Sequence, residues 1–217
     1  MPMTPPMTPP DFAHWFTPGA VVPTEDKRDV TFDVRELGEI GLPTGELVAC
    51  DPIVHLCDDD ERPAPFAVTV PPGRYRVQIA EASFTYPYDH TVNAAARLVI
   101  RDTPVARWEP ALVPGEATPE DDYFGYGVDA GLGSFLDTAA HHSFPGMDDE
   151  KGVIWEVLDS PRSPGAFLAE GENGHTIAVF VSGWGDGLYP TWVGRDADGE
   201  VACFVTDLRP FRFAKVL

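Results

Sequence analysis

The sequence has few cysteines and no pattern that would pair them. Cys50, Cys57 and Cys203 are odd in number and show no CxxC spacing, so neither a disulfide framework nor a zinc ribbon is predicted. His55 stands two residues before Cys57, but no second pair follows at the spacing of a zinc site. We therefore expect reduced, buried thiols and a cytoplasmic protein.

Long apolar runs and targeting signals are also missing. No segment reaches the apolar length needed to cross a bilayer. The first ten residues, MPMTPPMTPP, contain no lysine, no arginine and no apolar core, so they do not resemble a signal peptide. The expectation is a soluble protein that does not enter a membrane.

Basic residues are scarce, with 15 Lys and Arg against 35 Asp and Glu and a formal net charge of −20. Such a field repels phosphate backbones and anionic lipids, so no nucleic acid and no membrane surface is expected as a partner. A basic protein, a cation or a small neutral ligand suits this charge. An acidic surface also keeps a protein soluble, and this simpler explanation stays open.

The 23 prolines and 20 glycines of this 217-residue chain divide it into short elements. Strands are predicted within 45–54, where Asp51-Pro52 ends the strand, and at 66–70, 74–80, 95–101 and 105–108, with the last two forming a hairpin-like pair. One helix is predicted from Ser134 to His142, because Ser134 and Asp137 match a capping box. We predict a mainly β fold, an antiparallel β-sandwich or open barrel with one or two short helices.

The chain divides into an N-terminal arm and a body. Residues 1–28 are predicted to form a proline-rich mobile tail and an arm, and residues 29–217 a single β-rich domain. The arm carries three large aromatic residues, Phe12, Trp15 and Phe16. They would cover a hydrophobic patch if this segment packs on the body.

Two segments, FGYGVDAG (124–131) and SGWGDGLY (182–189), alternate glycines with aromatics and carry one aspartate each. In the first, strand alternation places Gly125, Gly127 and Asp129 on one face. If the two segments are neighbouring strands, Asp129 and Asp186 converge. The candidate ligand-binding residues are then the two aspartates with three aromatics, Tyr126, Trp184 and Tyr189.

Several chemistries suit these residues. Paired carboxylates can share a proton in acid–base catalysis or bind Mg²⁺ or Ca²⁺, and His141 is a further metal candidate. Carboxylates beside aromatic rings also suit a neutral ligand such as a sugar. In a purely structural alternative, the glycines let aromatic side chains pack, and the aspartates bond neighbouring amides.

Two other motifs favour structural explanations. Asp196 to Gly199 resembles part of a calcium loop but lacks its terminal glutamate, and a hairpin turn at Asp198-Gly199 explains it. Ser134 directly follows Gly133, but the glycines that Gly-x-Ser-x-Gly places two residues before and after the serine are missing. A nucleophilic serine is therefore not predicted.

Four long motifs together resemble the bacterial family designated domain of unknown function 4241. They are GELVACDPIV (45–54), VPPGRYRVQIAEA (70–82), DYFGYGVDAGLGSFLD (122–137) and SGWGDGLYPTWVGRDADGEVACFVTDL (182–208). The resemblance runs from about Leu37 to Leu208 and leaves out the arm. It implies a bacterial, intracellular, stand-alone domain whose glycine–aspartate segments are family features, and it supplies no activity or catalytic set.

Our leading hypothesis is an acidic binding or interaction module that uses the glycine–aspartate segments. Its most concrete form is an immunity-like protein that neutralises a basic toxin, because opposite fields speed association. One alternative is a hydrolase that uses Asp129 and Asp186 as an acid–base pair or as ligands of a divalent metal. The other is a purely structural domain.

Overall fold

The computed structural model describes residues 8–24, 29–56, 62–85, 88–116, 124–144 and 164–211. Antiparallel strands dominate this part of the chain, and the only α-helices in it are α1 (Phe12–Trp15) and α2 (Pro52–Leu56). Two 3₁₀ turns, η1 (Thr138–Ala140) and η2 (Glu172–Gly174), complete the helical elements. The predicted fold class, antiparallel β with short helices, is confirmed.

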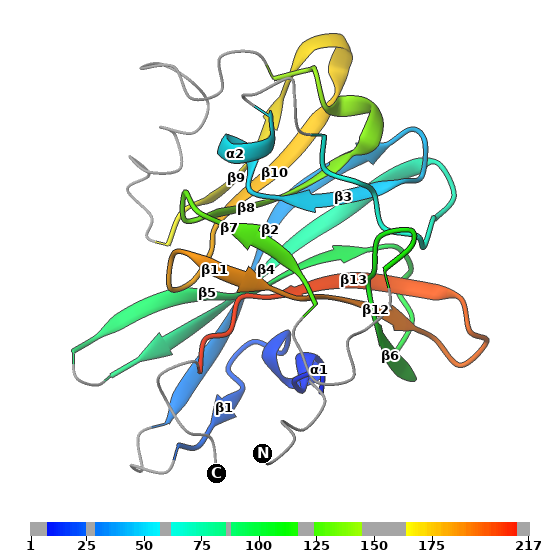
Figure 1. Cartoon of the computed structure of the whole chain (residues 1–217). Coiled ribbons are helices and arrows are strands. Elements are labelled where there is room, and N and C mark those ends of the chain that lie inside the picture. The colour runs from blue at the N-terminus through cyan, green and yellow to red at the C-terminus, as the bar shows by residue number, and fades with distance from the viewer. Residues whose placement is uncertain are drawn as a thin grey trace, which may run out of the picture.

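The strands form two large sheets and one small ribbon (Figure 1). The seven-stranded sheet runs, in spatial order, through β1 (Val21–Val22), β2 (Val30–Leu42), β4 (Gly73–Phe84), β5 (His90–Val99), β13 (Val201–Asp207), β12 (Thr191–Arg195) and β6 (Arg107–Pro110). The four-stranded sheet consists of β3 (Leu47–Cys50), β8 (Leu132–Asp137), β10 (Thr176–Val181) and β9 (Ala166–Glu170). The ribbon pairs β11 (Gly187–Tyr189) with β7 (Tyr126–Val128).

The main core lies between the two large sheets. Buried residues of β4, such as Ile79, share one apolar cluster with Phe135 of β8, Phe180 of β10 and Phe204 of β13. Face-to-face packing of this kind removes the inner face of each sheet from water. The ribbon belongs to the same core, because Tyr189 of β11 lies in this cluster.

Further apolar clusters cover the outer faces of both sheets. Phe12, Trp15 and Phe16 of the arm pack on the seven-stranded sheet, and Trp15 stacks on Phe32 of β2 at 5.5 Å. The arm also adds β1 to that sheet by pairing with β2. Residues 8–24 thus pack on the body as expected, residues 1–7 lie outside the described residues, and the division at residue 28 stays a prediction.

The predicted helix from Ser134 to His142 is wrong. Residues Leu132 to Asp137 form β8, which pairs with β3 on one side and β10 on the other. Two ladders of backbone hydrogen bonds and full burial outweigh the local capping signal. Asp137 does act as a cap, but of η1, where its Oδ1 accepts the N–H of Ala139 at 2.8 Å.

Two strand predictions also need correction. Residues 66–70 form no strand, because their N–H groups bond to separate carbonyls of Leu47, Leu112 and Gly45 rather than to one ladder. The segments 95–101 and 105–108 do not form a hairpin. β5 pairs with β4 and β13, whereas β6 pairs with β12 at the edge of the sheet.

Within the described residues, no helix combines the length and apolarity that a membrane crossing requires.

Asp207, the last residue of β13, is a buried carboxylate with 9% of its surface exposed. Its Oδ1 accepts the N–H of Arg209 at 2.7 Å. Burial nevertheless raises the pKa of Asp207 from 3.8 to about 6, because desolvation disfavours the charged form more than Arg209 stabilises it.

A folded-state pKa above the unfolded value means that the folded protein holds this proton to higher pH. The free energy of unfolding should therefore rise, relative to Asp207→Asn, as the pH falls from about 7 to about 4. The pKa of Asp207 differs by about two between the folded and unfolded states. In urea unfolding, we therefore expect the free energy of unfolding to rise by roughly 2 kcal/mol relative to that of Asp207→Asn. A constant difference between the two proteins over this interval would contradict the assignment.

Candidate functional site

The two glycine–aspartate segments lie side by side. β7 and β11 pair in antiparallel register, with Val128 opposite Gly187 and Tyr126 opposite Tyr189. Asp129 and Asp186 directly follow the last pair, so they flank the same end of the ribbon. The two segments are thus neighbouring strands, which is the condition under which Asp129 and Asp186 were expected to converge.

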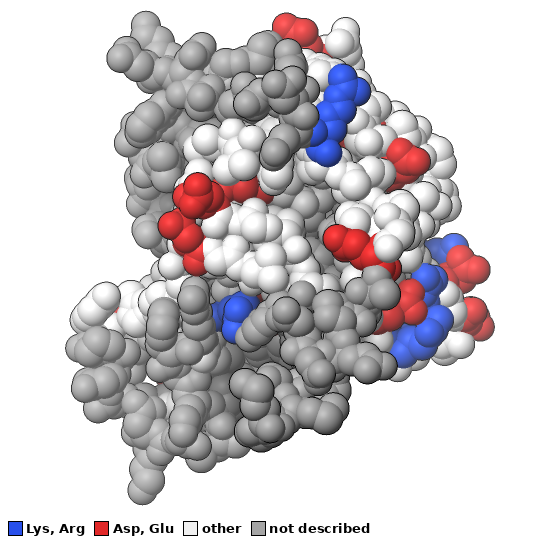
Figure 2. Space-filling view, viewed as in Figure 1, with Lys and Arg blue, Asp and Glu red and all other residues white. Residues whose placement is uncertain are grey.

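The loops beyond this last pair are also in contact. The N–H of Ser182 donates to the carbonyl of Gly131 at 2.9 Å. A Cβ added at Gly131 would lie 3.9 Å from the Cα of Gly185. Asp129 and Asp186 are both exposed, and acidic side chains are visible on the surface over this end of the ribbon (Figure 2).

Tyr189 fixes the loop that carries Asp186. Its ring is 2% exposed, and its hydroxyl lies 2.7 Å from the carbonyl oxygens of both Ser182 and Gly185. The hydroxyl of Ser182 donates to the same Gly185 carbonyl at 2.9 Å. Tyr189 therefore positions the loop from the interior, and its ring offers no platform to a ligand at the surface.

The other two aromatics also turn inward. The indole N–H of Trp184 donates to the carbonyl of Pro210 at 3.1 Å, and its ring lies 5.7 Å from that of His90. Tyr126 points its hydroxyl towards Gly133 of β8. Burial raises the pKa of Tyr126 above its usual value, so the phenol stays neutral and packs as part of the core.

The fold requires glycine at positions 125 and 133 but not at position 127. Gly125 has a φ of +141°, and a Cβ there would overlap the carbonyl of Tyr189. A Cβ at Gly133 would overlap the Tyr126 hydroxyl and the ring of Phe180, which is the packing role of the structural alternative. Gly127 shows neither constraint, because no described atom lies within 4 Å of a Cβ built there.

Asp51 supports the candidate site from the interior, a role that the sequence motifs did not predict. Its side chain is fully buried. Oδ2 accepts the N–H groups of Asp129 and Ala130 at 3.0 and 2.7 Å, and Oδ1 accepts those of Ile53 and Val54 at 3.0 and 3.4 Å. One carboxylate thus joins the start of α2 to the turn that presents Asp129. The sequence does contain one signal for the start of α2, the pair Asp51-Pro52. Aspartate is favoured at a helix N-cap and proline at the first helical position.

His141 lies apart from the aspartate pair. It is 9% exposed, packs edge-on against His142 at 4.6 Å between ring centres, and lines a hollow with Asp137 and Arg62. In the described ranges, no three His, Cys, Asp or Glu residues are grouped closely enough to hold a metal ion. Mg²⁺ or Ca²⁺ at Asp129 and Asp186 stays a prediction, and Cys57 lies outside the described residues.

The remaining motifs have structural roles. Asp196 accepts the N–H groups of Asp198 and Glu200, both at 3.0 Å, in the turn between β12 and β13, so the hairpin explanation is confirmed. The hydroxyl of Ser134 is buried and donates to the carbonyl of Cys50 at 2.8 Å. Burial also raises the pKa of the Cys50 thiol to about 12, which makes it an inert core residue.

A family model described as "Protein of unknown function (DUF4241)" matches residues 40–206. The chain belongs to this family. The matched region of the DUF4241 chain includes Asp51, both aspartates and the whole β7–β11 ribbon, and it begins after α1 and β1. No curated protein and no solved structure matches the chain.

Replacing Asp51 tests whether one buried carboxylate supports the site. Asp51→Asn keeps one acceptor oxygen but places an NH₂ group against two backbone N–H groups. We expect a loss of about 2–4 kcal/mol in the free energy of unfolding, since buried N–H groups lose charged acceptors.

Asp129→Asn is the matched control, because the bonded atom of Asp129 is its backbone nitrogen and its side chain is exposed. It should unfold within about 0.5 kcal/mol of the unmodified protein, as surface changes usually do. Equal stability of both variants in urea unfolding would show that Asp51 does not hold this turn.

Proposed function

We propose that the DUF4241 chain is a binding module that holds a basic protein against the glycine–aspartate face, defined by Gly127, Asp129 and Asp186. The observation that carries the proposal is an open glycine beside two exposed carboxylates. The fold does not require glycine at position 127. A partner's backbone can approach the bare strand there, while the carboxylates pair with its lysines or arginines.

The charge of the chain supports the same partner. A net charge of −20 attracts a basic protein from a distance and accelerates encounter, while the local carboxylates set its orientation. An immunity-like protein that covers the basic active site of a toxin is the most concrete form of this proposal. The cytoplasm is the proposed location, since Cys50 and Cys203 are both buried and free.

A second candidate function is a divalent-metal or acid–base hydrolase that uses Asp129 and Asp186. Their positions at the same end of the ribbon favour it. Two features weigh against it: both side chains are exposed, and the described residues supply no third metal ligand nearby. Catalytic carboxylates usually act in enclosed sites, so the binding module is the better supported proposal.

The test compares two variants of equal fold and different surface. Asp129→Asn with Asp186→Asn removes both carboxylates of the face. The control, Asp198→Asn with Glu200→Gln, removes the same charge from the exposed β12–β13 turn. In pull-downs from native cytoplasm at low salt, we expect the control to recover a basic protein and the face variant to recover at least about tenfold less.

Raised salt should lower the amount of basic protein that the unmodified chain recovers. At physiological ionic strength, salt largely screens the interaction of exposed charges more than about 8 Å apart, and this distance shortens as salt is added. Recovery of no basic protein at low salt would contradict the proposal. If both variants recovered equally less of the basic protein, its binding would be a nonspecific effect of net charge and not a property of this face. Metal-dependent turnover that Asp186→Asn abolishes would favour the hydrolase instead.

A further inference from the structure

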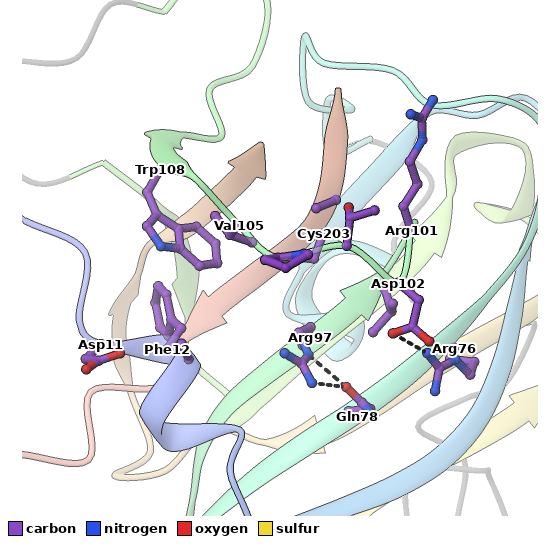
Figure 3. A pocket seen from close by; sticks show the side chains of 15 residues that line it. Asp11, Phe12, Arg76, Gln78, Arg97, Arg101, Asp102, Val105, Trp108 and Cys203 are labelled. Atoms are coloured by element: carbon purple, nitrogen blue, oxygen red, sulfur yellow. Dashed lines mark hydrogen bonds and ion pairs between the residues drawn. The ribbon is translucent and has the colours of Figure 1, made fainter. Parts of the chain in front are cut away.

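A second hollow lies on the face of the seven-stranded sheet that the arm covers. Its volume is about 370 Å³, within the range of about 300–1,000 Å³ typical of small-molecule sites. We call it the arginine pocket, and its main lining residues are Phe12, Gln78, Arg97, Val105, Trp108 and Cys203 (Figure 3). None of its lining residues belongs to the glycine–aspartate face.

Arg97 of β5 lies at the floor of this pocket with one side of its guanidinium occupied. Nε and Nη2 both donate to the amide oxygen of Gln78, the former at 2.7 Å. The ring of Phe16 covers one face at 4.0 Å. Nη1 has no hydrogen-bond partner among the described residues, so the end of the guanidinium fork can still donate.

Arg97 forms no direct ion pair in the described part of the chain, unlike its neighbours. Arg76 pairs with Asp102 at 3.3 Å, and Arg101 pairs with Glu200 at 3.1 Å. Burial lowers the pKa of Arg97 from its usual value, because the charged form loses hydration. An arginine remains charged even so, and among the described residues Glu36 and Asp102 favour that charge without forming an ion pair with it. A partly buried charge without a direct ion pair is costly. An anionic ligand would relieve that cost.

The wall beside Arg97 is apolar and aromatic. Phe12 of α1 packs edge-on against Trp108 of β6 with ring centres 4.9 Å apart, and Val105 extends this surface. Figure 3 shows these two rings on one side of the guanidinium and the Arg76–Asp102 pair on the other. Asp11, Arg76, Arg101 and Asp102 also line the pocket. The pocket therefore combines the guanidinium fork of Arg97 and an apolar wall with further charged side chains of both signs.

We propose that the arginine pocket binds a small monocarboxylate with an aromatic or apolar body. The planar carboxylate matches the free end of the guanidinium fork, and the body packs against Trp108 and Val105. A single unpaired cation in a chain of net charge −20 favours one negative charge over the two of a phosphate monoester. This inference does not depend on the basic partner proposed above.

Titration of the full chain with benzoate, phenylacetate and 3-phenylpropionate tests the pocket, followed by calorimetry and by NMR of the indole N–H signals. At least one of the three should bind saturably and shift the signal of Trp108, but not that of Trp184, which does not line the pocket. The corresponding neutral amide should bind at least about tenfold more weakly, since a charge-assisted hydrogen bond is lost. Inorganic phosphate should not compete at equal concentration.

Arg97→Gln should weaken binding at least about tenfold, whereas Arg74→Gln removes an exposed arginine outside the pocket and should leave affinity unchanged. Trp108→Leu supplies a second variant if Arg97→Gln fails to fold, and it should also weaken binding. The inference is overturned if none of the three acids binds, if acid and amide bind equally, or if Trp184 responds in place of Trp108.

Discussion

The candidate site depends on one buried carboxylate that lies beneath it. Asp51 accepts four backbone N–H groups, two from the start of α2 and two from the turn at Asp129 and Ala130. Four donors compensate the desolvation of a fully buried charge. The same bonds tie the corner between β3 and α2 to the end of β7. Because Asp51 fixes the backbone of Asp129, the surface carboxylate needs no contact of its own and stays exposed.

Local patterns in the sequence predicted features that depend on neighbouring residues. Alternation placed Gly125, Gly127 and Asp129 on one face, and all three are exposed, while Asp198-Gly199 predicted the β12–β13 turn. Features that depend on distant pairing were not predicted. Ser134 fits a capping box, yet its backbone is held by β3 and β10. Asp51 lies between β3 and α2, and Arg97 lies within β5. Only the folded chain shows that the first meets four N–H groups and that the second forms no direct ion pair with a described residue.

The two proposed surfaces offer a ligand opposite charges: the glycine–aspartate face offers carboxylates, and the arginine pocket offers a guanidinium. The glycine–aspartate face carries two exposed carboxylates of a chain whose net charge is −20, and this charge is the basis of the proposed attraction for a basic protein. The arginine pocket opposes that charge with a guanidinium shielded by Phe16 and Gln78. Its floor lies in the region matched by the DUF4241 model, whereas Phe12 and Phe16 lie before that region. The packed arm therefore completes a pocket whose floor is built by the family domain.

The most direct measurement places a large side chain on the open strand position of the glycine–aspartate face. Gly127→Trp meets no described atom within 4 Å at its Cβ and no unfavourable φ, so the melting temperature should stay within about 2 °C of the unmodified protein. The account predicts that this variant, with every carboxylate intact, no longer recovers the basic partner at low salt. Undiminished recovery by a fully folded Gly127→Trp protein would contradict the claim that the partner docks on this face.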